Sequence, residues 1–312
     1  MSLSKHWKMK WALQKLFSVS PGGRAMNHFF QRFVTRGVVW GSRRFRDGLG
    51  NVKQHFHATQ KYGVGREGLV VLELGTGWLP NIAVGMSLGG AKKVYTVDIH
   101  RHMRARALEA TLLHFQKNID SEQVQKTLGT VGDGKRESLE RAISAVQRGE
   151  VEEALASLDI EYLVQDVRYL PLQDNYVDLV VSRTTLEHIP EDDLEEILVE
   201  FRRVISAKGI MNHLVDLQDH YAMFDPAITP YNFLQYNDRR WSLYNTDFQW
   251  QNRLRINDYV RLHESAGFEV IAHDDERKHG SLLSRVKLDA RFQRYTQEDL
   301  EVTTSWIVSR GR

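Results

Sequence analysis

The sequence contains no cysteine among its 312 residues and has six prolines. The absence of cysteine excludes disulfides, thiolate nucleophiles and cysteine-ligated zinc or iron–sulfur sites. It also agrees with a reducing compartment, so we expect a cytoplasmic protein. No run of apolar residues approaches the roughly 20 that a membrane-spanning helix needs. The early lysines are not followed by the apolar segment of a secretory signal, so we expect none.

The composition is that of a folded domain. Hydrophobic residues make up 42% of the sequence and charged residues 26%, which is enough apolar surface for a sizeable core. The net charge of +2 is unevenly distributed, because residues 1–66 carry 13 basic side chains and one acidic one. We therefore divide the chain into a basic, aromatic helical arm or cap, residues 1–66, and a larger domain, residues 67–312.

The basic arm has two segments with helical patterning. Residues 5–19 form one predicted helix, whose apolar face would consist of Met9, Ala12, Leu13 and Leu16. A second helix is expected over residues 28–40. Such an arm could be a helical cap over the core or over the mouth of an active site. Alternatively, its positive charge could attract an anionic acceptor or make peripheral contact with a membrane. No motif for nucleic-acid binding occurs, so we expect no such partner.

From residue 69 onward, strands and helices alternate, which predicts an α/β fold with a parallel sheet. An apolar run at residues 69–74 ends in a glycine-rich turn, and a helix at 81–88 leads to a second strand at 93–97. Later strands are expected at residues 161–164, 176–182, 210–215, 268–272 and 302–309. Amphipathic helices are expected at residues 191–206 and 258–266.

Two stretches are longer than the connections of such a fold require. Residues 100–158 are polar and helical, and we interpret them as an insertion. Residues 216–256 are rich in aromatic and amide side chains, which could line an acceptor pocket or pack as a loop over the sheet. Arg253 and Arg255 in this loop would suit an anionic acceptor.

The turn after the first strand contains Gly75 and Gly77. A glycine-rich turn lets a ligand approach the backbone and meet helix-terminal N–H groups, although such a turn can also be purely structural. Pro80 stands where a dinucleotide-binding fingerprint has its third glycine, which argues against a nicotinamide dinucleotide.

Acidic residues follow the next two strands. Asp98 is placed to accept the hydroxyls of a ribose, and Asp166 to accept an exocyclic amine, although each could instead cap a helix. Because open α/β sheets bind ligands at the carboxyl ends of their strands, the turn and the two acids together predict a nucleoside-bearing ligand.

These segments resemble the class I S-adenosylmethionine-dependent methyltransferases, with motifs like those of methyltransferase type 11. The resemblance covers about residues 68–216. Its motifs, in family order, are residues 71–77, 94–98, 165–167, 170–189 and 201–209. It implies a Rossmann-like sheet of seven strands with helices on both faces and an antiparallel last strand, to which this chain adds the N-terminal arm and the insertions.

The resemblance also implies S-adenosylmethionine as the cofactor. It implies that Gly75 and Gly77 lie against the methionine part, Asp98 against the ribose, and Asp166 with Val167 against adenine. Neighbouring residues expected to contribute are Glu73, Thr76, Ile99 and Ser182.

The acceptor side offers candidates for catalysis. The sulfonium already makes the methyl group electrophilic, so the protein mainly has to align the acceptor and exclude water. A hydroxyl acceptor would also need a base, and the loops after strands four and five offer His188, Asp216, Asp219 and His220. The last three would also suit a metal site, but without a second clear set of ligands we predict no metal.

The sequence therefore predicts an S-adenosylmethionine-dependent methyltransferase that acts on a small molecule or a glycan, with O-methylation preferred. N- or C-methylation on the same fold is an alternative. Two further alternatives are a nicotinamide-dependent oxidoreductase and a non-catalytic, cofactor-binding scaffold that residues 1–66 dock to an anionic surface. The sequence does not indicate whether the protein is a monomer or an oligomer.

Overall fold

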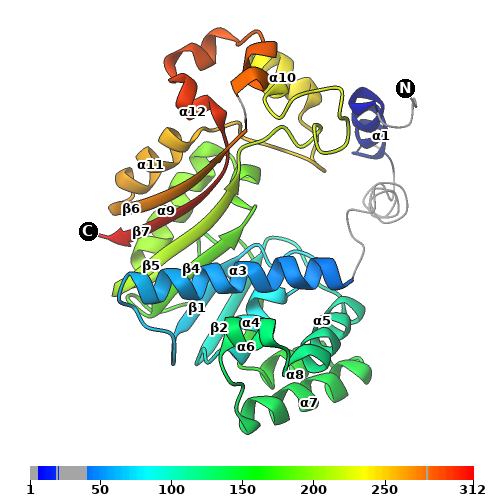
Figure 1. Cartoon of the computed structure of the whole chain (residues 1–312), viewed down its shortest axis with the longest axis vertical. Helices are drawn as coiled ribbons and strands as arrows, with labels where there is room; N and C mark the ends of the chain where they lie inside the picture. Colours follow the sequence, from blue (N-terminus) through cyan, green and yellow to red (C-terminus); the bar gives the residue numbers. More distant parts are fainter. Residues whose placement is uncertain (1–5, 19, 21–40, 279) are drawn as a thin grey trace.

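The computed structural model describes residues 6–18, 20, 41–278 and 280–312 (Figure 1). Their strands form one seven-stranded sheet in the order β3-β2-β1-β4-β5-β7-β6. The strands are β1 (Val70–Leu74), β2 (Lys93–Asp98), β3 (Ile160–Val164), β4 (Val177–Arg183), β5 (Ile205–Asp216), β6 (Phe268–Arg277) and β7 (Val302–Gly311). Strands β1 to β5 pair in parallel, and β7 is antiparallel to both β5 and β6. This confirms the predicted sheet with its antiparallel last strand.

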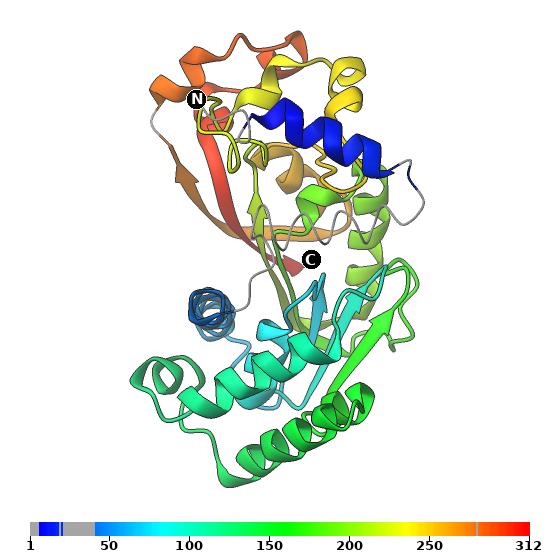
Figure 2. The same ribbon diagram turned by 90° about the vertical axis from the view of Figure 1, so that its right-hand side faces the viewer.

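Helices cover both faces of the sheet (Figures 1 and 2). One face carries α3 (Ser42–Lys61), α4 (Asn81–Leu88), α5 (Ala105–Asn118), α6 (Glu122–Leu128), α7 (Asp133–Gln147) and α8 (Val151–Ala156). The other carries α9 (Glu191–Val204) and α11 (Ile256–Ser265). Successive strand residues point to opposite faces of the sheet, so each strand contributes to both hydrophobic cores. Val71 and Leu179 face the first group of helices, and Leu72 and Val180 face the second. Helix α9 confirms the amphipathic helix predicted at 191–206.

Helix α3 belongs to the basic arm by composition but packs as part of the core. Phe45, Leu49, Val52 and Phe56 recur every three or four residues along it, and all four are buried. The helix lies close against α4 because Gly85 has no side chain, and a Cβ there would sit 2.6 Å from a methyl of Val52. The sequence patterning did not separate this helix from the rest of the arm.

The long connection at residues 100–158 consists of α5 to α8. The helical character predicted for this stretch is confirmed, and Gly129 ends α6 before α7 begins. Helices α5 and α7 pack together, and α5 sends Leu108, Leu112 and Phe115 into the core that also contains α3 and α4. The connection therefore extends the helical layer over one face of the sheet.

A separate lobe lies beyond β5 and β7. Its elements are η3 (Asn232–Gln235), α10 (Asp238–Tyr244), η4 (Gly280–Arg285), η5 (Ala290–Arg294) and α12 (Gln297–Glu301). Tyr231, Phe233, Trp241 and Phe292 are buried and pack against one another, away from the two cores of the sheet. The aromatic residues predicted to line a pocket or to pack as a loop therefore form the core of this lobe.

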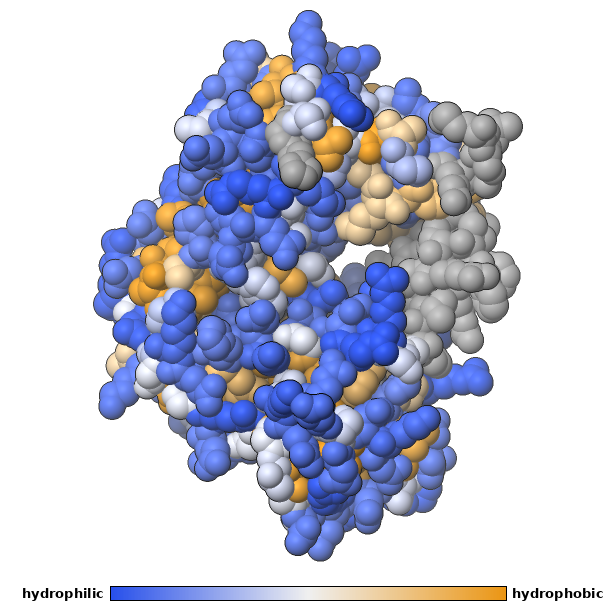
Figure 3. Space-filling model, in the orientation of Figure 1, coloured by the Kyte–Doolittle hydropathy of each residue, from blue (hydrophilic) through white to orange (hydrophobic). Residues whose placement is uncertain are grey.

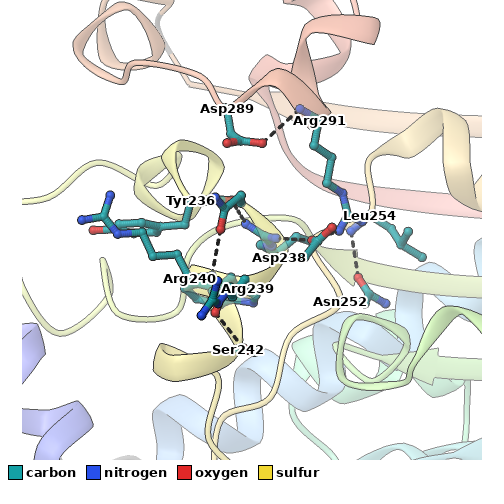
Figure 4. Close-up of polar contacts among 12 residues, drawn as sticks. Tyr236, Asp238, Arg239, Arg240, Ser242, Asn252, Leu254, Asp289 and Arg291 are labelled. Atoms are coloured by element: carbon teal, nitrogen blue, oxygen red, sulfur yellow. Dashed lines mark hydrogen bonds and ion pairs between the residues drawn. The ribbon is translucent and has the colours of Figure 1, made fainter.

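Polar contacts hold the lobe together. Asp238 at the start of α10 forms ion pairs with Arg291 of η5 and with Arg253. Figure 4 shows the side chain of Arg291 extending toward Asp238. Segments far apart in the sequence are thereby fixed to one another.

The N-terminal helix α1 (Trp7–Ser18) docks on this lobe (Figure 2). Trp7 is 4% exposed and lies against Tyr221 and Tyr244, with ring centroids 5.3 Å and 5.0 Å away. The Trp7 N–H donates to Asp225 Oδ2 at 2.9 Å, and Trp11 Nε1 donates to the carbonyl of Leu243 at 2.7 Å. The first helix of the arm is therefore anchored to the lobe by its tryptophans.

Helix α1 confirms the helix predicted within residues 5–19, but the predicted apolar face is not the one that packs on the lobe. Met9 and Leu16 are 39% and 57% exposed, whereas Trp7 and Gln14 are buried. The surface that α1 covers is aromatic, and the large tryptophan rings bury more area against it. The second helix expected at residues 28–40 lies outside the described residues. In the part of the chain that is described, no helix has the length and apolar character to cross a membrane.

Replacing Trp7 by alanine should loosen α1 from the lobe. Truncating a buried aromatic residue lowers stability by about 3 to 5 kcal/mol. In Trp7→Ala this loss cannot exceed the free energy with which α1 docks on the lobe. We expect hydrogen exchange of residues 221–244 to speed up in Trp7→Ala, while Met9→Ala on the exposed face leaves it unchanged. Equal exchange in Trp7→Ala and the wild type would contradict this docking.

Candidate active site

The glycine turn connects β1 to α4 at the carboxyl edge of the sheet. Gly75 and Gly77 have φ values of +81° and +64°, which favour glycine. A Cβ on Gly75 would collide with the side chain of Thr185, whereas no atom lies within 4 Å of the place that a Cβ on Gly77 would take. The backbone at Gly77 is therefore open to an approaching ligand.

A buried polar network supports this turn from below. Thr96 Oγ1 donates to Glu73 Oε2 at 2.8 Å, and the hydroxyls of Thr96 and Thr76 are in contact. Burial raises the pKa of Glu73 to about 7, although Thr96 and the backbone N–H of Ala83 in α4 both favour its ionised form. Glu73 and Thr76, predicted near the cofactor, are thus buried, with Glu73 linked through Thr96 to the turn.

Asp98 ends β2 beside the turn. Its Oδ2 accepts the Gly77 N–H at 3.0 Å and the hydroxyl of Tyr162 at 3.1 Å. Burial raises the pKa of Asp98 to about 6, against these hydrogen bonds, which favour the charged form. A largely buried carboxylate thus lies next to the open backbone at Gly77, where a ribose could be held.

The other residues predicted around the nucleoside have different environments. Ile99, directly after Asp98, is an exposed apolar side chain at 67% exposure, and Val167 is buried. Arg168 forms an ion pair with Asp166, and its guanidinium also pairs with Asp193. The hydrogen bonds from Arg168 hold the pKa of the Asp166 carboxyl below its usual range. An amine that binds Asp166 would therefore have to share it with Arg168.

Ser182 lies inside the sheet. Its hydroxyl is fully buried and lies 2.8 Å from Nδ1 of His213, the residue opposite it on β5. The His213 ring stacks on Phe201 of α9. The side-chain contacts of Ser182 are therefore those of a core residue under α9, although its backbone pairs with Leu74, just before the glycine turn.

Two histidines meet where β4 and β5 end. The rings of His188, in η2 (Leu186–His188), and His220 have centroids 5.0 Å apart. His220 Nε2 lies 3.5 Å from Asp216 Oδ2, and His188 Nδ1 lies 2.6 Å from the carbonyl of Trp250. Burial opposes ionisation of Asp216, but bonds to His220 and Gln218 hold its pKa below the usual value. Three of the four predicted catalytic residues therefore form one group.

Asp219, the fourth of them, is fully buried at the base of the lobe. It accepts hydrogen bonds from the Tyr221 N–H and from Asn232 Nδ2, both at 2.8 Å. Burial raises its pKa to about 6, opposed by Asn232, Tyr221 and the charges of His220 and Lys10. Its hydrogen bonds are those of a residue that holds the lobe together.

The structure adds residues to the site that the sequence analysis did not single out. Tyr162 reaches Asp98 because parallel pairing sets β3 beside β2, with Leu163 opposite Val97. Glu187 is 2% exposed, and burial together with the charge of Asp216 raises its pKa well above the usual value. Tyr162 lies outside the motifs, and Glu187 lies within the one at residues 170–189, but only strand pairing and the bend at η2 show that the two side chains reach the site.

Arg253 and Arg255, which suggested an anionic acceptor, instead bind backbone carbonyls of the lobe. Arg253 Nη1 donates to the carbonyls of Phe233 and Tyr236, at 3.0 and 2.5 Å. Arg255 is fully buried and donates to the carbonyl of Leu217 at 2.7 Å. Both side chains clamp backbone inside the lobe, so this part of the sequence interpretation was wrong.

Comparisons with known proteins agree with this architecture. The methyltransferase-domain family model matches residues 130–212, which include β3, β4 and part of β5. No curated protein matches the chain.

Several solved structures are similar to this one. An S-adenosylmethionine-dependent methyltransferase from Clostridium acetobutylicum is 11% identical with a TM-score of 0.46, covering 92% of this chain and 98% of that one. A methyltransferase of the same kind from Methanosarcina mazei is 14% identical with a TM-score of 0.44, covering 81% and 96%. The magnesium protoporphyrin IX methyltransferase from Synechocystis is 12% identical with a TM-score of 0.43, covering 86% and 83%.

The strand order and the domain match together define a Rossmann-like methyltransferase. The domain match and the strand order are consistent with a class I S-adenosylmethionine-dependent methyltransferase, whose cofactor would be S-adenosylmethionine. The open backbone at Gly77 and the carboxylate of Asp98 beside it fit the methionine and ribose parts of this cofactor. The match begins at residue 130, so the glycine turn lies outside it and stands on its own geometry.

Replacing Asp98 by asparagine should weaken binding of S-adenosylhomocysteine, because hydrogen bonds to a charged group contribute about 1.5 to 3 kcal/mol. This corresponds to a loss of affinity of roughly ten- to 150-fold, measurable by calorimetry. Wild-type affinity should also fall as the pH drops below about 6, since protonation of Asp98 removes its charge. The asparagine variant should lack this pH dependence.

Asp192, an exposed acid on α9, supplies the matched control. Asp192→Asn should bind S-adenosylhomocysteine as the wild type does. Unchanged affinity in Asp98→Asn would remove Asp98 from the cofactor site.

Proposed function

We propose that the protein transfers the methyl group of S-adenosylmethionine to a hydroxyl oxygen of a small molecule or a glycan. The observation that carries this proposal is the group formed by His188, His220 and Asp216 at the ends of β4 and β5. Strand β4 pairs in parallel with β1, and β5 pairs in parallel with β4. The group therefore lies at the same edge of the sheet as the glycine turn. An imidazole and carboxylate group beside a methyl donor is suited to a hydroxyl acceptor.

The cofactor would be held along the edge formed by β1 and β2. We assign the backbone of Gly75 and Gly77 to its methionine part and Asp98 to its ribose. The exposed side chain of Ile99 would pack on the adenine, near Val167 and Asp166. Tyr162 holds the carboxylate of Asp98 in position through its hydroxyl.

S-adenosylmethionine supplies an electrophilic methyl group, so the residues of the chain have to position the acceptor and take up its proton. The His220 ring would accept the hydroxyl proton as the oxygen attacks, with Asp216 at 3.5 Å stabilising the imidazolium. His188 is oriented by the carbonyl of Trp250 and would hold the acceptor oxygen from the other side.

The acceptor would enter between the lobe and the helical layer of the sheet. Figure 3 shows that the molecule is hollowed between these two parts. Arg44 of α3 and Arg183 at the end of β4 interact electrostatically, and burial with the charge of Arg44 lowers the pKa of Arg183. These two cations, of which Arg183 also interacts with the charges of Glu187 and Asp216, would suit a polar acceptor that carries negative charge.

The test is turnover of a panel of sugars, glycosides and phenols with methyl-labelled cofactor, and the product's carbon–oxygen linkage is identified by NMR. Exclusive transfer to nitrogen or carbon would refute O-methylation. It would leave the assignment of the chain to the methyltransferases intact.

With the acceptor found, His220→Ala should lower turnover by about 10²- to 10⁴-fold, the usual contribution of general acid–base catalysis. Affinity for S-adenosylhomocysteine should stay unchanged, because His220 is assigned to the acceptor. His57→Ala, an exposed histidine on α3, is the control and should behave as the wild type. Normal turnover in His220→Ala would exclude a role in proton transfer.

A further inference from the structure

Glu187 joins the two histidines in a cluster that the proposed methyl transfer does not require. One donor atom from each of Glu187, His188 and His220 lies within 4.8 Å of the others. Donors that share one ion at about 2.1 Å are roughly 3.4 Å apart, so small side-chain rotations would bring these three to bonding distance. Glu187 and His188 lie in η2, and His220 follows β5, so the cluster bridges two neighbouring strand ends.

Two side chains of this cluster have buried polar atoms without a well-formed hydrogen bond in the described chain. Neither carboxylate oxygen of Glu187 accepts a hydrogen bond of good geometry, although the backbone N–H groups of Glu187 and Asp216 favour its ionised form. His220 Nε2 is likewise buried, and its nearest partner is Asp216 Oδ2 at 3.5 Å. Buried polar atoms without partners are costly, so native structures usually provide a partner, water or an ion. Two such side chains that point at one another therefore indicate a ligand between them.

The surroundings of the cluster are those of a metal site. His188 Nδ1 lies 2.6 Å from the Trp250 carbonyl oxygen. This contact favours the tautomer with the proton on Nδ1, which leaves the Nε2 lone pair available to bind a metal ion. A histidine that ligates a metal usually gives its other N–H to such a carbonyl or a carboxylate. Asp216 Oδ2, 3.5 Å from His220 Nε2, is close enough to act as a further ligand or to receive a proton.

We propose that Glu187, His188 and His220 bind one divalent transition-metal ion at the acceptor side of the active site. Two imidazoles and one carboxylate are ligands for Zn²⁺ and its neighbours, whereas Mg²⁺ and Ca²⁺ prefer oxygen ligands. Three protein ligands leave a coordination position open for an acceptor oxygen. From the sequence, the group of Asp216, Asp219 and His220 lacked a second clear set of ligands, so no metal was predicted, and Glu187 was not part of that group.

The role of the ion in turnover rests on the proposed O-methylation, whereas its binding does not. With the ion bound, His220 would ligate it instead of taking up the hydroxyl proton, and the proton of the acceptor O–H bond would pass to the Asp216 carboxylate. The oxygen lone pair then forms the new O–CH₃ bond as the S–CH₃ bond breaks, and the sulfur keeps its electron pair in S-adenosylhomocysteine.

The test is calorimetric titration of tag-free, chelator-treated protein with Zn²⁺, together with the visible absorption spectrum of the Co²⁺-loaded protein. We expect one equivalent of Zn²⁺ per chain and a Co²⁺ spectrum with nitrogen ligands. Glu187→Gln, which keeps the shape of the side chain, and His188→Ala should each weaken binding by at least about 100-fold. His57→Ala should bind as the wild type does.

A Zn²⁺ stoichiometry near zero would overturn the proposal, as would equal affinity in Glu187→Gln, His188→Ala and the wild type. Should a variant fail to fold by circular dichroism, the Co²⁺ spectrum of the wild type decides, and a spectrum of hexa-aqua type refutes the site. Metal binding without any O-methylated product would contradict the proposed function alone. O-methylation by chelator-treated protein that binds no Zn²⁺ would contradict the metal site alone.

Discussion

Parallel pairing of β1 with β2 on one side and β4 on the other is the constraint on which the site depends. This pairing sets Leu74 opposite Val97 and Ser182, so the residues that follow all three strands emerge at one edge of the sheet. The hydrogen bond from the Gly77 N–H to Asp98 then fixes the turn after β1 to the end of β2. Because β4 pairs with β5, the same edge also carries the histidines.

The sheet and the turn were predictable because their signals are local. The apolar strands, the glycines at positive φ and the acid after β2 each occupy a few consecutive residues, and strand alternation orders them without knowledge of distant contacts. For the same reason the sequence indicated that Asp98 and Gly77 lie at one edge of the sheet, where a hydrogen bond joins them. Ser182 was also named, but its side chain points into the core, and a pattern of strand residues alone did not decide which face it takes.

The lobe and the arm were harder to predict, since their structure depends on contacts between segments far apart in the chain. The buried face of α1 is set by Tyr221 and Tyr244, more than 200 residues away, and a helical period alone did not reveal it. Arg255 resembled a ligand-binding cation, yet it satisfies backbone carbonyls at the base of the lobe. Glu187 acquires its chemical importance only when the bend at η2 places it beside His220.

The central claim is that cofactor and acceptor meet at the carboxyl edge formed by β1, β2, β4 and β5. A crystal structure of the protein with S-adenosylhomocysteine tests it most directly. The account predicts ribose hydroxyls on the Asp98 carboxylate, the homocysteine part along Gly75 and Gly77, and the sulfur facing the His188 and His220 rings. A cofactor bound elsewhere, or a sulfur separated from His220 by protein atoms, would contradict it.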